Sequence, residues 1–358
     1  MPSHETVHAG SSAAAIQGAI NTAGPGGHVT LAPGTYSIDR TLNIRQPLTL
    51  EGRAALRRAP GFQGALIGVF DTEDVDVLGL RLDDRYDFST PLADENVFAI
   101  HVNNSRDVRI AGTKIENITR NGIVAGQSYD VRIQDNLVAD AKGVGQSVTG
   151  RGGIGIIARG CHGVLIEGNT GRRNWRGTIY GHSTRGIIIR GNTCLDDHPK
   201  ESDEAGIERG GPIGVSYGCT DYVIEGNYID AAYAGQGIEI DVMEITRVTG
   251  PATQYGVIKG NTIVAQGYAG ITLYVEPKNS SERKEAHVTI TGNVIRDCSL
   301  RGNTYYAAIT VFPGITDYVV TANAVRQRGG KGYAAHGQNY RSVVADNRFD
   351  ERPLAITT

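Results

Sequence analysis

A short phrase in which apolar and polar residues alternate recurs along most of the chain. Each copy closes with Gly-Asn or a similar pair. Alternation with a period of two is typical of a strand with one buried face, and the closing pair is typical of a turn. The clear copies are VLIEGNT (164–170), IIIRGNT (187–193), YVIEGNY (222–228), GVIKGNT (256–262), VTITGNV (288–294), YVVTANA (318–324) and SVVADNR (342–348). Two weaker copies precede them, VRIAGTK (108–114) and VRIQDNL (131–137).

A second motif, a small residue followed by alternating apolar positions, lies between these copies. Its forms are NGIVAG, GGIGII, GTIYGH, GPIGVS, QGIEID, AGITLY and AAITVF. Asn169 and Asn192 are 23 residues apart, and Asn323 and Asn347 are 24 apart. A unit of this length cannot close a core alone, but stacked units bury a continuous one. We therefore predict an all-β fold, a right-handed parallel β-helix (solenoid) of about 10–12 coils with three strands per coil.

The N-terminal segment differs from the repeats and predicts a cap. SSAAAIQGAINTAG (11–24) begins with serines, carries alanines and apolar residues at helical spacing, and closes with glycine, so it predicts a helix. A solenoid needs such a cap, because its end coil exposes unpaired backbone groups. HVTLAPGTYSI (28–38) then predicts two strands joined by a Pro-Gly turn. We expect a single β-helix domain over 1–358, with coils over 28–350.

This helix followed by GGHVTLAPGTYSI, with coils of the form xIxGNxI behind it, resembles the pectin-lyase-like superfamily of right-handed parallel β-helices. The resemblance covers nearly the whole chain. Its motifs are those that make the fold, and no catalytic signature of one family matches position by position. Because similar folds occur in polygalacturonases and inulin fructotransferases, the resemblance implies an enzyme that acts on carbohydrate.

Composition narrows the function classes further. The net charge of −3 gives no reason to expect nucleic acid or a membrane as partner. The start, MPSHETVHAG, lacks a secretory signal, so we expect a cytoplasmic protein, or a secreted one whose signal was removed. The cysteines show no CxxC spacing, which favours reduced, mostly buried thiols over disulfides or a zinc site; they are Cys161, Cys194, Cys219 and Cys298.

The recurring asparagines have a structural interpretation. Asparagine tolerates the left-handed backbone of a sharp corner, and identical side chains in register can hydrogen-bond along the stack. We assign this role to Asn169, Asn192, Asn227, Asn261 and Asn293.

Insertions between the repeats mark where function could lie. We expect them near 84–96, 140–152, 196–211, 243–255, 276–287 and 297–306. Those at 243–255 and 276–287 follow the second motif directly on two successive coils. Paired loops that leave the same strand on adjacent coils would form a wall beside its outer face, and loops on a rigid scaffold often carry binding residues.

Aligning the second motif by its inward isoleucines places the polar residues in two outward columns. The inward residues are Ile179, Ile213, Ile238, Ile271 and Ile309. The first column reads Tyr180, Gly214, Glu239, Thr272 and Thr310, and the second reads His182, Ser216, Asp241, Tyr274 and Phe312. Small residues thus separate one polar pair from the other, which predicts a shallow floor about 9–10 Å across, as in a carbohydrate groove.

The columns offer acid-base chemistry. Glycoside cleavage needs one acid and one nucleophile or base, and Glu239 with Asp241 could supply both, or either one with Glu276. Mutual repulsion would keep one of the two protonated. His182 and Tyr180 would assist. The expected substrate-binding residues are Tyr274, Trp175, Ser216, Arg176, Arg209 and Phe312. The structural alternative is that outward acids on a solenoid only solvate it.

Two further clusters have weaker functional interpretations. CLDDHPKESDEAGIERGG (194–211) is rich in carboxylates, which favour calcium, but its spacing matches no calcium motif and a solvated acidic loop fits better. GRRNWRG (171–177) could bind a sugar acid or be an ordinary charged turn. We therefore expect no metal site and no cofactor, with calcium as the alternative.

Three functions remain open. The first is hydrolysis or intramolecular transfer at a glycosidic linkage of an oligosaccharide or polysaccharide. The second is a uronate lyase or C5-epimerase using Tyr180 and His182 with Arg209 or Arg247; an acidic face argues mildly against its polyanionic substrate. The third is a non-catalytic glycan-binding solenoid, for which a homo-oligomer, such as a trimer, would be typical.

Overall fold

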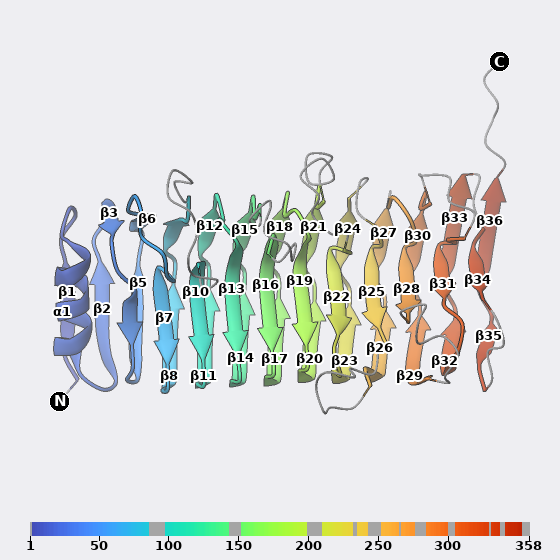
Figure 1. The fold of residues 1–358 in the computed structure, drawn as a ribbon, viewed down its shortest axis with the longest axis horizontal. Helices are drawn as coiled ribbons and strands as arrows, with labels where there is room; N and C mark the ends of the chain where they lie inside the picture. The colour runs from blue at the N-terminus through green and yellow to red at the C-terminus, as the bar shows by residue number, and fades with distance from the viewer. Residues whose placement is uncertain are drawn as a thin grey trace, which may run out of the picture.

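The computed structural model describes residues 2–85, 97–142, 152–198, 210–231, 235–242, 252–264, 266–275, 284–299, 305–328, 331–336 and 341–352. Over these residues the chain winds into a solenoid of three long parallel sheets, here called A, B and C (Figure 1). In each coil a sheet C strand is followed by one of sheet A and then one of sheet B. The prediction of an all-β right-handed parallel β-helix is confirmed.

Among the described residues, sheet A has 13 strands: β1 (His4–Val7), β2 (Gly27–Leu31), β5 (Leu48–Gly52), β8 (Glu73–Leu78), β11 (Arg106–Ala111), β14 (Tyr129–Gln134), β17 (His162–Glu167), β20 (Arg185–Arg190), β23 (Thr220–Glu225), β26 (Gln254–Lys259), β29 (Lys284–Thr291), β32 (Ile315–Thr321) and β35 (Val343–Ala345). Sheet B has 12 in the same ranges: β3 (Thr35–Ile38), β6 (Ala55–Arg58), β9 (Arg81–Asp83), β12 (Lys114–Glu116), β15 (Leu137–Ala139), β18 (Thr170–Arg172), β21 (Thr193–Leu195), β24 (Tyr228–Asp230), β27 (Thr262–Val264), β30 (Val294–Arg296), β33 (Ala324–Arg328) and β36 (Arg348–Arg352). Sheet C has 11 described strands: β4 (Leu42–Ile44), β7 (Ile67–Phe70), β10 (Phe98–Asn103), β13 (Asn121–Gly126), β16 (Ile154–Arg159), β19 (Gly177–His182), β22 (Ile213–Ser216), β25 (Ile238–Asp241), β28 (Ile271–Tyr274), β31 (Ile309–Val311) and β34 (Tyr333–Ala335).

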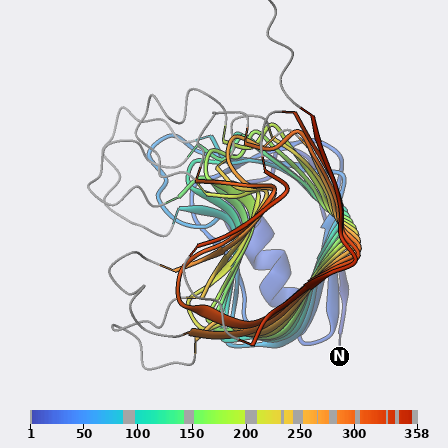
Figure 2. The same cartoon turned by 90° about the vertical axis from the view of Figure 1, so that its right-hand side faces the viewer.

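The predicted cap is present as α1 (Ala13–Ala23). The side chain of Ser12 accepts a hydrogen bond from the backbone N–H of Ala15, and Gly24 ends the helix. Ile16 and Ile20 are fully buried, and Figure 2 shows the helix lying across the N-terminal end of the space that the sheets enclose. The helix therefore covers the end of the core.

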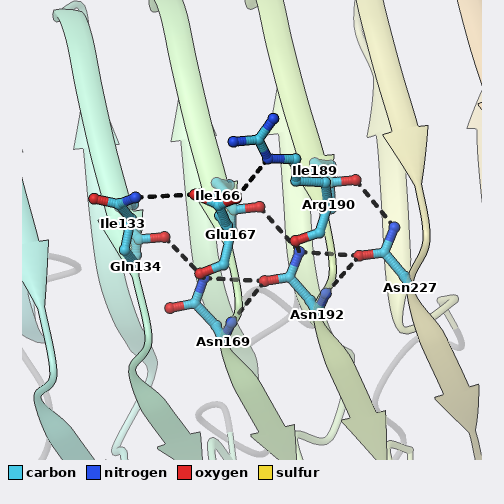
Figure 3. A network of polar contacts seen from close by, with 9 residues as sticks. All are labelled: Ile133, Gln134, Ile166, Glu167, Asn169, Ile189, Arg190, Asn192 and Asn227. Carbon is cyan, nitrogen blue, oxygen red and sulfur yellow. Dashed lines mark hydrogen bonds and ion pairs between the residues drawn. The ribbon is translucent and has the colours of Figure 1, made fainter.

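The recurring asparagines form a hydrogen-bonded ladder at the corner between sheets A and B (Figure 3). Asn192 shows the pattern: its Oδ1 accepts from the backbone N–H of Asn169 at 2.9 Å, and its Nδ2 donates to the carbonyl of Ile166 at 2.9 Å and to Oδ1 of Asn227 at 3.0 Å. The expected left-handed backbone is one residue earlier, for example at Gly168 with φ 65°. The prediction of a ladder is confirmed, but the conformational role belongs to the residue before each asparagine.

The four cysteines are free and buried, as expected. Burial raises the pKa of Cys219 and of Cys298 to about 12, so both remain thiols. No helix among the described residues is long and apolar enough to cross a membrane.

Most of the expected insertions lie outside the described residues. In chain order, 86–96, 143–151, 199–209 and 300–304 each separate a sheet B strand from the next sheet C strand, and 243–251 and 276–283 each separate a sheet C strand from the next sheet A strand. The last two were predicted too long, because β26 begins at Gln254 and β29 at Lys284. In the sequence, each insertion thus directly precedes or follows a strand of sheet C.

Candidate functional site

The outer face of sheet C carries the two predicted columns in the predicted register. Ile179, Ile213, Ile238, Ile271 and Ile309 pair in sequence across β19, β22, β25, β28 and β31. Tyr180 pairs with Gly214, Gly214 with Glu239, and Asp241 with Tyr274. The isoleucines are fully buried in the core. The acids therefore point away from the core, on the outer face of sheet C.

Tyr180 occupies the floor that the sequence predicted to be open. A Cβ atom added to Gly214 would lie 2.5 Å from Cε1 of the Tyr180 ring, and one added to Gly177 would lie 2.8 Å from its Cε2. The ring thus lies against strand β22, and it is only 5% exposed. The ring thus covers the predicted shallow floor at Gly214, because the missing side chain there makes room for it.

His182 lies beside Tyr180 in a positively charged environment. Its ring makes edge contacts with Tyr180, at 5.8 Å between centroids, and with Tyr217, at 4.8 Å. Arg159 is its register partner on β16, and the Arg176 guanidinium lies 5.7 Å from the centre of the Tyr180 ring. Burial, together with the charges of Arg176 and Arg159, lowers the pKa of His182 to about 3. The imidazole is therefore neutral at physiological pH.

Glu239 and Asp241 are partly buried on β25, two strands beyond Tyr180 and His182. Neighbouring strands lie about 4.8 Å apart, and alternate residues on a strand about 6.6 Å apart. The pKa of the Tyr306 phenol is raised to about 12. Burial is the main cause, and the negative charge of the nearby Glu239 carboxylate is the second. The acids thus have the Tyr180–His182 pair on one side and aromatic residues on the other.

An aromatic cluster extends beyond the acids. Tyr268 stacks on Tyr306 at 4.9 Å with an interplanar angle of 21°, and Tyr274 meets Phe312 edge-on at 4.8 Å. Tyr305 stacks on His336 at 3.7 Å. The cluster consists of Tyr268, Tyr274, Tyr305, Tyr306, Phe312 and His336. Tyr305 is exposed and the other tyrosines are partly buried; aromatic rings with an accessible face suit sugar rings, whose C–H faces are apolar.

The other expected substrate-binding residues differ in their placement. Trp175 and Arg176 are partly buried at the corner that leads into β19. Ser216 is 7% exposed, and Phe312 is only 6% exposed beneath the tyrosines, so it supports their rings instead of offering its own. Glu276, Arg209 and Arg247 lie outside the described residues.

The expectation of a solvated acidic loop at 194–211 fails at its start. Asp197 is 1% exposed and His198 is fully buried. Asp197 is buried because it accepts hydrogen bonds from Asn174 and Thr178 of the preceding coil. The remaining acids of this segment, from Glu201 to Glu208, lie outside the described residues. Within the part of the chain that the structure describes, no three His, Cys, Asp or Glu side chains are grouped to hold a metal ion.

Sequence reasoning missed Arg159, Tyr217, Tyr268, Tyr305 and Tyr306 as parts of this face. One signal was present: Tyr268 and Tyr306 each stand three residues before an inward isoleucine of the second motif, Ile271 and Ile309. Equal positions in neighbouring coils stack, so the repeat itself predicts that these two rings meet.

The comparisons with known proteins agree with this fold. Residues 98–275 match the family model described as "Right handed beta helix region". The fold of the chain is that of the right-handed parallel β-helices of the pectin-lyase-like superfamily. No curated protein sequence matches it.

Solved structures resemble it at low identity. The A-module of a mannuronan C-5 epimerase from Azotobacter vinelandii gives a TM-score of 0.65 at 15% identity, over 96% of this chain and 94% of the other. An exopolygalacturonase from Thermotoga maritima gives 0.61 at 12% identity, over 97% and 92%. A mutant tailspike protein of an E. coli bacteriophage, in complex with a pentasaccharide, gives 0.65 at 14% identity, over 94% and 60%. At these identities the likeness shows the fold and not the reaction.

Proposed function

We propose that this protein is a carbohydrate-active enzyme that cleaves or rearranges a glycosidic linkage, with the glycan lying along the outer face of sheet C. One observation carries the proposal. Glu239 and Asp241 lie on the outer face of strand β25, with Tyr180 and His182 two strands away on one side and the aromatic cluster on the other. Carboxylates beside aromatic rings are the groups that bind and cleave a neutral sugar chain.

In this mechanism one carboxylic acid protonates the leaving oxygen, while the other carboxylate attacks the anomeric carbon or activates the nucleophile. Water as nucleophile gives hydrolysis, and a hydroxyl of the same glycan gives intramolecular transfer. The tyrosine rings of the cluster would hold the sugar units next to the scissile bond. Tyr180 and His182, which is neutral, would hydrogen-bond the unit on the other side.

A lyase or C5-epimerase is the second candidate, and the charges around His182 favour it. Arg159 and Arg176 both act on this ring electrostatically. A uronate carboxylate placed beside them would be bound by cations, which also lowers the cost of removing the neighbouring C5 proton. Tyr180 and His182 are the candidate acid and base in this reaction.

Product analysis separates these chemistries. The protein is incubated with matched panels of neutral and uronate oligosaccharides, and products are followed by mass spectrometry and by ultraviolet absorbance. Hydrolysis adds water without absorbance, transfer changes linkage without adding water, and elimination creates an absorbing unsaturated uronate. Epimerisation in deuterated water incorporates deuterium at C5 without cleavage. Binding without any product would overturn both enzymatic proposals in favour of a glycan-binding solenoid.

A further inference from the structure

The corner that leads into β19 is held by a buried carboxylate from the next coil. Oδ1 of Asp197 accepts from the backbone N–H of Asn174 at 2.9 Å, and Oδ2 accepts from Oγ1 of Thr178 at 2.5 Å. Asp197 is 1% exposed, and the other two residues are fully buried. One side chain therefore ties both ends of the segment 174–178.

His198 adds a second tie to the same segment. Its Nδ1 lies 2.7 Å from the carbonyl oxygen of Trp175, and its backbone N–H donates to the carbonyl of Asn174 at 2.8 Å. Residues 197–198 thus contact three of the five residues of the corner by hydrogen bonds. This contact has no counterpart in the sequence interpretation of 194–211 as a solvated loop.

The carboxylate is chemically unusual at this position. In the ladder between sheets A and B the equivalent task, accepting a backbone N–H from the preceding coil, is performed by asparagines. Asn174 itself performs it for Ala141, at 3.2 Å, and its Nδ2 donates to Oγ1 of Thr178 at 3.1 Å. The Thr178 hydroxyl therefore accepts from Asn174 and needs an acceptor for its own proton. The second oxygen of Asp197 accepts it, whereas an asparagine turned to keep its bond to the Asn174 N–H would present an N–H instead.

This arrangement carries a cost that an asparagine would avoid. Burial raises the pKa of Asp197 to about 7, against the opposing hydrogen bonds from Thr178 and Asn174. The charged and titratable groups around it are Asp196 and Cys194, which interact with it electrostatically, and His198 beside it in the chain. A costly buried acid that ties a single corner points to a role for that corner.

The corner carries residues of the candidate site. Trp175 and Arg176 lie within it, and Thr178 precedes Tyr180 by two residues in β19. The Arg176 guanidinium lies over the Tyr180 ring at 5.7 Å and lowers the pKa of His182. A shift of this segment would thus move Arg176, Tyr180 and His182 together.

We propose that Asp197 is a positioning residue, which through Asn174 and Thr178 fixes the corner bearing Trp175 and Arg176 and so sets the place of Tyr180 and His182 on the outer face of sheet C. The link to catalysis rests on the proposed function, whereas the link to the corner does not. Because burial favours the protonated form of Asp197, ionisation leaves a poorly solvated charge in the corner, and the corner should loosen as pH rises through the pKa of this acid.

Trp175 is the only tryptophan of the chain, so its fluorescence reports on this corner directly. We expect the emission of the wild-type protein to change in one transition with a midpoint near pH 7, the pKa of Asp197. Asp197→Asn should abolish the transition. Thr178→Val, which removes only the hydroxyl donor, should move the midpoint to higher pH, because the ionised carboxylate loses a hydrogen bond. Circular dichroism establishes that each variant is folded, and Thr178→Val carries the test if Asp197→Asn does not fold.

Two controls identify the titrating group. Asp196→Asn changes an adjacent acid whose side chain is 67% exposed, so the transition should remain, with its midpoint slightly lower. His198→Gln should also retain it. A transition that persists unchanged in Asp197→Asn, or that disappears in His198→Gln, would overturn the proposal.

Activity provides the last readout, on a glycan that the protein is found to convert. Asp197→Asn should lower kcat/KM by about 10- to 100-fold, because small misplacements of reacting groups have effects of this size, and should remove the change in rate near pH 7. A fluorescence transition that follows Asp197 in a protein that converts no glycan would refute the proposed function alone. If the pH profile of turnover and the fluorescence transition are both the same in Asp197→Asn as in the wild type, the positioning role alone is refuted.

Discussion

A single methyl group added at Gly214 should displace Tyr180 and impair the candidate site. The new Cβ would lie 2.5, 2.8 and 2.9 Å from three carbons of the Tyr180 ring. Carbon atoms in contact normally lie about 3.5–4.0 Å apart, so the ring must retreat by about 1 Å. Because Gly177 and Gly210 also lie against this ring, it has little room on its other edges.

The expected effects of Gly214→Ala follow from that displacement. Overpacking of this kind typically lowers the free energy of unfolding by about 1–3 kcal/mol. A misplacement of about 1 Å at a reacting group can lower the rate about 100-fold. Urea-induced unfolding measures the first effect, and kcat/KM on a glycan identified by the product panel measures the second.

Gly18→Ala is the matched control. Gly18 lies in α1, and a Cβ added there would meet no atom within 4 Å. Alanine favours the helix over glycine by about 0.5–1 kcal/mol, so this variant should be slightly more stable and equally active. Unchanged stability and unchanged kcat/KM in Gly214→Ala would refute the placement of the Tyr180 ring over Gly214.

Three further predictions test the ladder and the two titrating groups. Asn192→Ala leaves the buried N–H of Asn169 without its acceptor and should lower the free energy of unfolding by about 2–5 kcal/mol; an unchanged urea midpoint would contradict this. Arg176→Gln removes a positive charge and should raise the pKa of His182 above about 3, as measured by NMR titration of its ring. An unchanged pKa would show that the charge of Arg176 does not act on His182. The folded protein holds the Asp197 proton up to a pKa of about 7, whereas the unfolded chain loses it near 3.8. As the pH rises from 3.8 to about 7, the free energy of unfolding of the wild type should therefore fall relative to that of Asp197→Asn, by up to about 1.4 kcal/mol per pH unit. A difference that does not change with pH would contradict the raised pKa of Asp197.

The fold and its register were predictable because each coil repeats the same constraints. Alternation fixed which face of each strand is buried, and equal spacing placed Tyr180, Gly214 and Glu239 in one row. The repeats could not show where a side chain turns after leaving the strand. The small residues Gly214 and Ser216 predicted a shallow floor, but they could not show that the Tyr180 ring covers Gly214.

The residues that escaped prediction lie where the repeat is interrupted. Asp197 stands at the beginning of an acidic insertion, and its burial depends on hydrogen bonds from the preceding coil, to Asn174 and Thr178. Tyr305 and Tyr306 stand at the end of another insertion, and although the repeat places Tyr306 next to Tyr268, it does not record that Tyr306 lies close to Glu239. Irregular segments take their structure from tertiary contacts, which a pattern of local periodicity does not record.

The most direct test of the account removes the two acids of β25 without changing their size. The double variant Glu239→Gln, Asp241→Asn is compared with the wild type on the glycan panel by mass spectrometry. The matched control is Glu225→Gln, a carboxylate on the outer face of sheet A that is paired with Lys259 at 2.8 Å. We predict that the control keeps its products and that the double variant loses them, with kcat lower by at least about 1,000-fold. Wild-type turnover by a folded double variant would contradict the assignment of Glu239 and Asp241 as the acid-base pair.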